Sequence, residues 1–464
     1  MRQKKSAITI KVIIIFFLVI TSTLLKSQNE YAIKLNFSGK SDSILILANY
    51  FGDKFQIVDT AGYMDNVMMF TGNTRLKGGI YLVLNSKKEK LFECLIDKDQ
   101  TFSILSDSSY SATQIKTIDN IENDLFNKHL IFTNQTYEKV NLLHKQIEKQ
   151  KNNQAVTDSL QLEITALSDK LIAYRQHEIA EHPGTYYAVL LKAMIEVKIP
   201  DDIKQKSDLA YAFMKKHYWD NFDLADSRLL RTPLLPGKID TYIEKLTPPL
   251  SDSVIQSIDF MIKLTRENKE TRDYLIWNFT SKYQNPKIMG LDKVFVYLAD
   301  NYFAKFDIAN TTPSIKQKII EKSDQLRKIL IGSKAPELWL IDSTGSYRSF
   351  SEIETDYTVI FFWDQECNIC KKELADLKKL YDNKKHNLEV YAVCANADMD
   401  GWKNFIRSNQ LSWLNVNGTK SMSVDFHDLY DIYATPVIYL LDKNKKIIAK
   451  RINANQISQV IQMQ

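Results

Sequence analysis

Two cysteines three positions apart, Cys367 and Cys370, are the residues of this sequence whose type and spacing best support chemistry. Thiols at this spacing can open and close a disulfide, because one sulfur attacks as a thiolate and the other releases the mixed disulfide. Cys94 and Cys394 each lie in a separate apolar run, where a cysteine usually serves as a small core residue. The cysteines therefore predict one dithiol site and two core positions, with a third redox thiol at Cys394 as the alternative.

A buried strand and an amphipathic helix should position the dithiol. Residues 357–363 are apolar almost throughout, which is typical of a central strand covered on both faces. One face of the helix that follows carries Cys370, Leu374, Leu377 and Tyr381. Cys370 should therefore point into the core, whereas Cys367 falls in the first turn, where unpaired N–H groups and the helix dipole favour a thiolate. This pattern predicts Cys367 as the nucleophile and Cys370 as the resolving thiol.

Carboxylates near the two cysteines would influence their chemistry. Glu373 lies one helical turn after Cys370, where it could accept or return the proton of the resolving thiol. An exposed helix acid without such a role is the alternative. Asp364 and Glu366 precede the nucleophile, and negative charge there opposes thiolate formation. Because no histidine or proline separates the cysteines either, we predict a reducing rather than a strongly oxidising dithiol.

The dipeptide Thr435-Pro436 supplies a second candidate part of the site. It lies about 65 residues after the cysteine pair and directly before an apolar run. A proline in this place can hold a cis peptide bond. A cis turn would present the backbone of Thr435 beside Cys367 and offer main-chain hydrogen bonds to an extended substrate. An ordinary trans turn is the alternative.

Three segments follow one another in a characteristic order: Phe361-Phe362-Trp363, Cys367-x-x-Cys370 with Glu373, and Ala434-Thr435-Pro436. In this order they resemble the TlpA/ResA-type thiol–disulfide oxidoreductases, which are thioredoxin-fold proteins of the bacterial envelope. The opening at 332–336 is similar to the start of that family and of the peroxiredoxins. The resemblance covers about residues 331–464 and implies a C-terminal α/β thioredoxin fold.

The resemblance also implies roles for individual residues. Cys367 would be the nucleophile, Cys370 the resolving thiol and Glu373 an acid, with Pro436 in cis. The expected site comprises Cys367, Cys370 and Glu373 for catalysis and Thr435, Pro436 and Trp363 for substrate contact. One departure from thioredoxins proper is Glu366, which stands where they carry tryptophan directly before the first cysteine, whereas the tryptophan of this chain, Trp363, comes earlier. The resemblance therefore does not imply the substrate range or the redox potential of thioredoxins proper.

The remaining chain predicts three further segments. Residues 1–27 have the layout of a secretory signal, with a basic start and a 14-residue apolar run that is short for a bilayer-spanning helix. A retained anchor is the alternative. Residues 28–112 carry short strands separated by turn residues, and residues 113–330 change to helical periodicity. We therefore expect a multidomain chain with an N-terminal all-β domain, an α-helical middle domain and a C-terminal thioredoxin fold at 331–464, an order that also resembles a multidomain subgroup of the family.

The charge balance bears on partners and location. The net charge is +5, but residues 1–27 hold five basic residues and no acid, so the rest of the chain carries 56 basic and 56 acidic residues. A neutral mature chain has no electrostatic footprint for nucleic acid. The expected location is the periplasm or cell envelope. The expected partners are protein thiols or disulfides and a membrane electron donor, with no cofactor or metal beyond a redox-active Cys367–Cys370 disulfide.

Three functions remain open on this basis. The leading hypothesis is an envelope enzyme that reduces or isomerises protein disulfides. A thiol peroxidase is the second, although peroxiredoxins place threonine where this chain has Asp364. The third is mainly a binding protein, in which residues 28–330 bind a partner and the redox domain is accessory.

Overall fold

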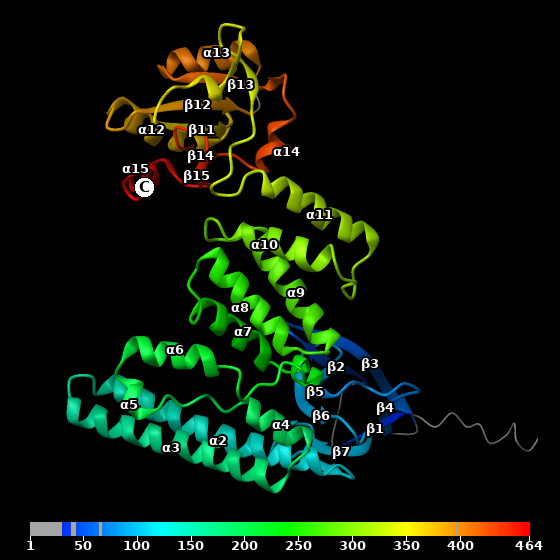
Figure 1. The fold of residues 1–464 in the computed structure, drawn as a ribbon. Helices are drawn as coiled ribbons and strands as arrows, with labels where there is room; N and C mark the ends of the chain where they lie inside the picture. Colours follow the sequence, from blue (N-terminus) through cyan, green and yellow to red (C-terminus); the bar gives the residue numbers. More distant parts are fainter. Residues whose placement is uncertain (1–29, 39–42, 65–66, 396–397) are drawn as a thin grey trace, which may run out of the picture. The chain divides into compact units, whose positions relative to one another are not determined.

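The computed structural model describes residues 30–38, 43–64, 67–395 and 398–464 (Figure 1). It divides into two compact units: an N-terminal unit up to Leu246 that also includes Leu264–Thr271, and a C-terminal unit of Thr247–Lys263 and Arg272–Gln464. The predicted signal at 1–27 lies outside the described residues. The predicted domain boundaries are not tested by this division and remain predictions.

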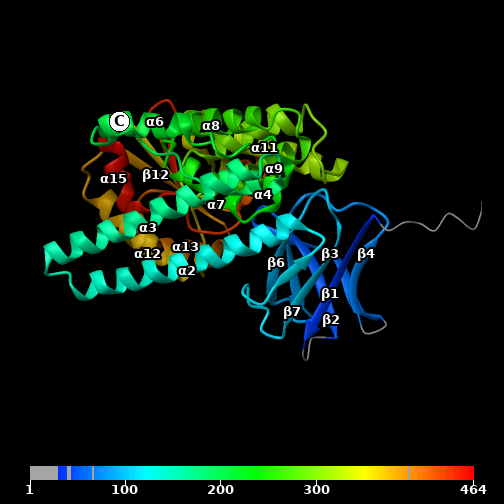
Figure 2. The same ribbon diagram turned by 90° about the horizontal axis from the view of Figure 1, so that it is seen from below.

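An eight-stranded sheet occupies the first part of the N-terminal unit (Figures 1 and 2). Its strands are β1 (Tyr31–Ser38), β2 (Ile44–Phe51), β3 (Lys54–Met64), β4 (Val67–Gly72), β5 (Gly79–Asn85), β6 (Lys90–Ile96), β7 (Thr101–Asp107) and β8 (Lys116–Ile118). Their order is β6-β5-β2-β3-β4-β1-β7-β8, in which β1 and β7 pair in parallel. Because side chains alternate along a strand, Tyr81 and Val83 of β5 join a core shared by β1 to β7, whereas Ile80 faces the other side.

Helices complete the N-terminal unit, and several of them pack on that other side of the sheet. They are α2 (Ile121–Lys149), α3 (Gln154–Glu181), α4 (Tyr186–Ala193), α5 (Asp201–Lys204), α6 (Ser207–His217), the 3₁₀ turn η1 (Ser227–Arg231) and α7 (Leu234–Glu244). The side chains of Asn120, Asn153 and Thr185 cap α2, α3 and α4 by accepting backbone N–H bonds. Ile80 of β5 and Leu95 of β6 share an apolar cluster with Phe126 of α2 and with Tyr186 and Leu190 of α4.

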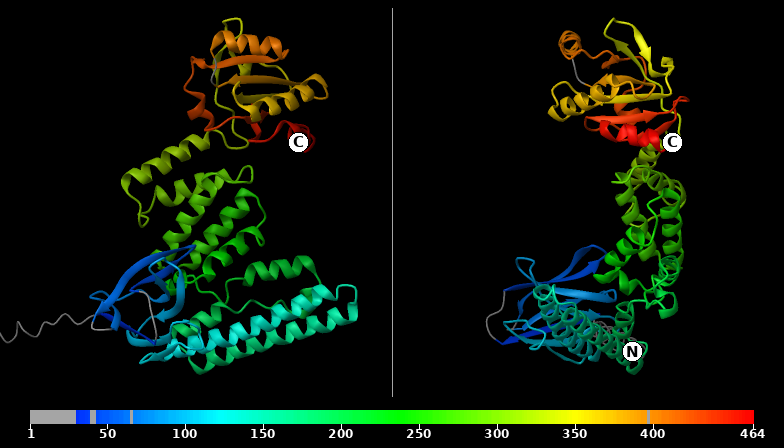
Figure 3. Two further views of the ribbon diagram at one scale, coloured as in Figure 1. Left: turned by 180° about the vertical axis from the view of Figure 1, so that it is seen from behind. Right: turned by 90° about the vertical axis from the view of Figure 1, so that its left-hand side faces the viewer.

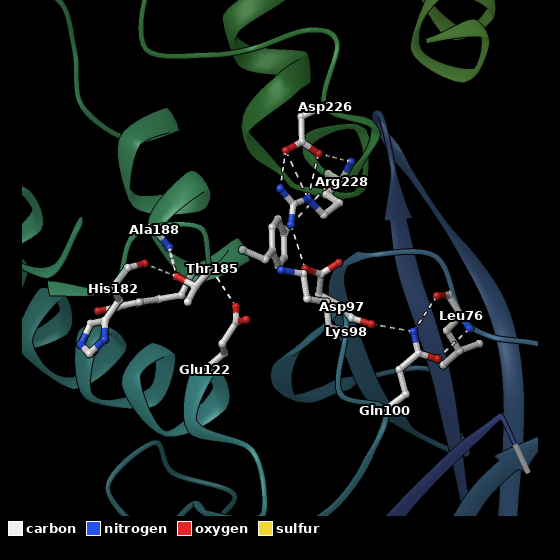
Figure 4. Close-up of polar contacts among 12 residues, drawn as sticks. Leu76, Asp97, Lys98, Gln100, Glu122, His182, Thr185, Ala188, Asp226 and Arg228 are labelled. Carbon is white, nitrogen blue, oxygen red and sulfur yellow. Dashed lines mark hydrogen bonds and ion pairs between the residues drawn. The ribbon is translucent and has the colours of Figure 1, made fainter. Parts of the chain in front are cut away.

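Polar contacts also join the sheet to these helices. The buried side-chain amide of Asn123 on α2 accepts a hydrogen bond from the Leu95 N–H and donates one to the Leu95 carbonyl, both at 2.7 Å. Figure 4 shows Arg228 of η1 bonded to Asp97, which follows β6, at 2.8 Å and to Asp226 at 2.6 Å. The structure thus confirms a strand-rich N-terminal region, and a separate all-β domain stays a prediction.

Five further helical segments come next in the chain, and most of their residues belong to the C-terminal unit. They are α8 (Ser251–Leu264), α9 (Lys269–Gln284), α10 (Asp292–Leu298), the π-helical turn η2 (Ala299–Phe303) and α11 (Pro313–Arg327). The predicted helical character of the middle region is thereby confirmed. Among the described residues, no helix is both long enough and apolar enough to cross a lipid bilayer.

A seven-stranded sheet with helices forms the rest of the C-terminal unit, drawn in yellow to red in Figure 3. Its strands are β9 (Trp339–Asp342), β10 (Tyr347–Ser349), β11 (Tyr357–Trp363), β12 (Leu388–Cys394), β13 (Leu414–Ser421), β14 (Val437–Leu441) and β15 (Ile447–Lys450). Its helices are η3 (Phe350–Glu352), α12 (Asn368–Asp382), α13 (Met399–Ser408), α14 (Phe426–Tyr430) and α15 (Ala454–Gln462). The order β10-β9-β13-β12-β11-β14-β15 places β11 between a parallel and an antiparallel neighbour, and residues 358–363 of β11 are buried, as predicted for a central strand.

Candidate active site

Cys367 lies at the N-cap of α12, after the loop that leaves β11. Its Sγ accepts a hydrogen bond from the backbone N–H of Cys370 at 3.2 Å, which is one of the N–H groups that a helix leaves without an internal partner. The side chain is half-buried, so the sulfur can meet a reactant from solvent. A thiolate here would be stabilised by that N–H and by the positive end of the helix dipole.

Cys370 lies one turn inside the helix and has a different environment. Its side chain is fully buried in the core with Leu374 and Leu377, as the helical spacing predicts. Burial, together with the hydrogen bond to the Cys367 thiol, raises the pKa of Cys370 to about 11. The two residues are not joined in a disulfide, so the site holds one accessible and one buried thiol.

Thr435 and Pro436 lie beside the nucleophile, where the loop after α14 enters β14. The Thr435–Pro436 peptide bond is cis. The carbonyl oxygen of Thr435 lies 3.7 Å from Sγ of Cys367 and accepts a hydrogen bond from the thiol. Both residues are partly exposed, as is Cys367.

Glu373 follows Cys370 by one turn but makes a contact that the sequence did not predict. One of its carboxylate oxygens accepts a hydrogen bond from the backbone N–H of Ala454, the first residue of α15. A carboxylate is a favourable partner for a helix N-terminus because of the helix dipole. Glu373 thus helps to fix α15 on α12, and its role in proton transfer stays a prediction.

The predicted substrate contact of Trp363 is wrong for this structure. The side chain is fully buried and packs against Phe405, with ring centroids 5.1 Å apart. Since Trp363 is the last residue of the central strand, its side chain belongs to the core beneath the dithiol. The Trp363 side chain therefore packs in the core under the two cysteines, and none of its surface is exposed to a substrate.

Two exposed apolar residues near the site were not singled out from the sequence. Ile369 lies between the two cysteines and is 69% exposed. Tyr433 lies two positions before Thr435 and is 77% exposed. Position within the motif is the signal that could have identified Ile369, because the residues between the cysteines surround the helix start. Ile369 offers apolar surface at the start of α12, whereas the Tyr433 hydroxyl accepts a hydrogen bond from Lys322 of α11 at 2.9 Å.

The two acidic residues before the nucleophile shape the turn into α12. The carboxylate of Asp364 accepts a hydrogen bond from the Glu366 N–H at 2.8 Å, and the Asp364 carbonyl accepts one from the Cys367 N–H at 3.2 Å. The Asp364 side chain is thus hydrogen-bonded to the backbone of the loop. These bonds hold Cys367 at the helix start.

Two family models match separate parts of the chain. The AhpC/TSA family model matches residues 331–450, which include the dithiol. The model described as a domain of unknown function, DUF5106, matches residues 143–302 in the helical region. Similarity to families therefore extends beyond the redox domain, but the helical part resembles a family without a stated function.

Curated relatives match part of the chain. The thiol-disulfide oxidoreductase ResA of Bacillus cereus is 26% identical over 126 residues, which are 26% of this chain and 70% of that protein. ResA of Bacillus subtilis is 26% identical over 118 residues, which are 25% of this chain and 64% of that protein.

Solved structures give similar matches. A domain of a possible thiol-disulfide isomerase from Cytophaga hutchinsonii is 41% identical, with a TM-score of 0.27, and covers 29% of this chain and 92% of that one. A thioredoxin-like protein from Bacteroides caccae is 20% identical, with a TM-score of 0.46, and covers 58% of this chain and 98% of that one.

The sheet has the strand order given above, and the dithiol lies where the loop after the central strand enters a helix. These two features define the class of thioredoxin-fold oxidoreductases. The ResA relatives and the AhpC/TSA match narrow the class further. The C-terminal domain belongs to the TlpA/ResA-like thioredoxin family, and the protein is an oxidoreductase.

Proposed function

We propose that the protein exchanges disulfides with protein thiols through Cys367 and Cys370, in the reducing or isomerising direction. One observation carries this proposal. The half-buried sulfur of Cys367 accepts the N–H of Cys370 at 3.2 Å, whereas the Cys370 thiol is buried and has a raised pKa. The two sulfurs thus differ in exposure and in pKa. Disulfide exchange requires such a difference, because attack needs an accessible thiolate and release of the substrate needs a second thiol nearby.

In the reducing direction, the thiolate of Cys367 attacks one sulfur of a substrate disulfide. A bond forms to that sulfur, and the other substrate sulfur leaves as a thiolate that takes up a proton. Cys370 then loses its proton and attacks Sγ of Cys367, which forms the Cys367–Cys370 disulfide and releases the second substrate thiolate. Two electrons pass from the dithiol to the substrate. In this scheme the carboxylate of Glu373 accepts the proton that Cys370 loses. The backbone of Thr435 forms the main-chain hydrogen bonds with the substrate.

Turnover in this direction requires a reductant that returns two electrons to the Cys367–Cys370 disulfide. We propose a membrane electron donor for this step and a location in the periplasm or cell envelope. The support is the signal-like composition of residues 1–27, with a retained N-terminal anchor as the alternative.

The test is the reduction of insulin by dithiothreitol in the presence of the protein. We expect Cys367→Ser to lose activity by roughly a hundredfold or more, because no other thiolate lies at the helix start. Cys94→Ala is the matched control, because Cys94 is buried in the N-terminal sheet. Full activity of Cys367→Ser would overturn the proposal.

A thiol peroxidase is the second candidate, and the match to the AhpC/TSA family is compatible with it, although the ResA relatives favour disulfide exchange. Against it stands Asp364, which occupies the place of the threonine that peroxiredoxins use near the peroxide. The reduced protein should therefore reduce insulin much faster than it consumes hydrogen peroxide. A faster reaction with peroxide would reverse the order of the two candidates.

A further inference from the structure

A cavity of about 680 Å³ lies among the helices of the N-terminal unit. It is lined by residues of α2, α3, α6 and α7 and of the segment that follows α4, all within this unit (Figure 1). Its volume falls within the range of pockets that bind small molecules. Nothing in the dithiol chemistry uses this cavity.

Arg175 of α3 lines the cavity and is buried without a carboxylate partner. The residue is only 8% exposed. One guanidinium nitrogen donates to the carbonyl of Met194 at 3.2 Å, and the guanidinium also interacts with the Tyr137 hydroxyl, while Nε has no hydrogen-bond partner among the described residues. A buried charge normally has a counter-ion, because burial without one is strongly unfavourable. The guanidinium of Arg175 therefore lacks the negative group that its position calls for.

The charge around Arg175 points to an anion as the missing partner. Lys238 and Lys245 also line the cavity, and the Lys238 ammonium lies 5.1 Å from the centre of the Tyr218 ring. Glu196 is the one carboxylate among the lining residues, and it is exposed. The lining thus carries three cationic side chains against one anionic side chain.

His129 of α2 is a second buried polar group at this cavity. It is 1% exposed, its Nδ1 has no hydrogen-bond partner among the described residues, and its Nε2 lies 3.3 Å from the Thr133 hydroxyl. Burial and the nearby charge of Arg175 lower the pKa of His129 to about 4. The imidazole is therefore neutral at pH 7 and can donate or accept a hydrogen bond, depending on its tautomer.

The rest of the lining is largely apolar. Apolar side chains come from Leu130, Met194, Val197, Met214, Leu234 and Leu246. Inorganic ions such as chloride or phosphate would leave this surface unfilled. An amphipathic molecule would cover it and bring its charged end to the guanidinium.

We propose that this cavity binds a small organic anion with an apolar body, whose negatively charged group pairs with Arg175. The planar guanidinium fork suits a carboxylate or a phosphate ester, because both accept two parallel N–H bonds. Lys238 adds a second positive charge, and His129 a neutral hydrogen-bonding group. The site is independent of the dithiol and gives the helical region a binding function of its own.

The test measures binding to the full-length protein by isothermal titration calorimetry and by the shift in melting temperature. The probes share one tail and are used below their micelle concentrations: decanoate, decyl phosphate, decanol and decyltrimethylammonium. We expect decanoate or decyl phosphate to bind and stabilise the protein, since a ligand that binds the folded state raises its stability. Binding of one anion but not the other identifies the headgroup class.

Two variants and one control make the result specific. Arg175→Gln should weaken binding of the anions by roughly tenfold or more, because it removes the charge-assisted bonds. Lys238→Gln should weaken it less and serves as the second variant if Arg175→Gln does not fold. Arg266→Gln is the control, because Arg266 is 70% exposed and lies outside the cavity lining. Equal binding of decanol or the ammonium probe, no binding of either anion, or undiminished anion binding in the folded variants would overturn the proposal.

Discussion

The dithiol site and the helical cavity differ in whether their polar side-chain atoms have hydrogen-bond partners within the chain. At the dithiol, the Cys367 sulfur lies between the N–H of Cys370 and the carbonyl of Thr435, so its hydrogen bonds are made within the chain. In the cavity, Nε of Arg175 and Nδ1 of His129 have no partner among the described residues. A site that passes electrons through its own sulfurs can be complete without a ligand, whereas a binding site is completed by what it binds.

The largest expected effect tests whether the dithiol is complete. Cys370→Ser keeps the nucleophile but removes the thiol that releases the substrate, so a mixed disulfide on Cys367 should accumulate. We expect insulin reduction to fall by roughly a hundredfold. The measurement is non-reducing electrophoresis with mass spectrometry of the adduct, and Cys94→Ala should form none. Normal turnover by Cys370→Ser would show that release does not need a second thiol in the chain.

A second effect, of intermediate size, concerns the N-terminal unit. A Cβ added at Gly79 would lie 2.3 Å from Cβ of Arg231 on η1, and a Cβ at Gly62 would meet no atom within 4 Å. Gly79→Ala should therefore lower the free energy of unfolding by about 2 kcal/mol through overpacking. Gly62→Ala should change it by less than about 0.5 kcal/mol.

Urea denaturation of the full-length chain measures both glycine variants. We expect the rate of insulin reduction per folded molecule to be unchanged in Gly79→Ala, since Gly79 lies in the N-terminal unit and the dithiol in the C-terminal unit. Equal stability of the two variants would mean that η1 moves away from β5 without cost.

The smallest effect separates the two roles of Glu373. Glu373→Gln keeps an oxygen that can accept the Ala454 N–H but cannot take up a proton at neutral pH. We expect the release step to slow by roughly tenfold. The free energy of unfolding should change by less than about 0.5 kcal/mol. Stopped-flow measurement of substrate release and urea denaturation provide the two readouts.

Asp376→Asn is the control for Glu373→Gln, because Asp376 is another acid of α12 that contacts α15, through Asn455 at 3.4 Å. Its release rate should match that of the unmodified protein. If Glu373→Gln loses stability and the release rate is unaltered, Glu373 only holds α15 and the proton of Cys370 goes elsewhere.

The sequence predicted where the two cysteines lie on the helix, because the signals for their positions are local. A run of apolar residues specified β11, and the spacing of Cys370, Leu374 and Leu377 specified which thiol is buried. The position of Thr435 beside Cys367 came from the order of motifs. The orientation of Trp363 could not be predicted in this way, because an apolar motif residue can face either the core or a substrate groove.

Other elements could not be predicted from the sequence, because contacts formed only in the folded chain stabilise them. β13 reads Leu-Asn-Val-Asn-Gly-Thr-Lys-Ser, which lacks the pattern of a buried strand. Its Asn415 is nevertheless buried, because its amide donates to the carbonyls of Leu411 and Trp413. The helical cavity escaped for a related reason: its lining comes from residues between 129 and 246, and no short segment carries its signal.

The side chain of Asn123 has a further consequence for the N-terminal sheet. β6 is the outermost strand at one end of that sheet, and Asn123 occupies both the N–H and the carbonyl of Leu95 on it. An unpaired outer strand is a template on which another chain can add and start aggregation. By imitating a neighbouring strand for one residue, this amide blocks the pairing of another chain with β6 at Leu95.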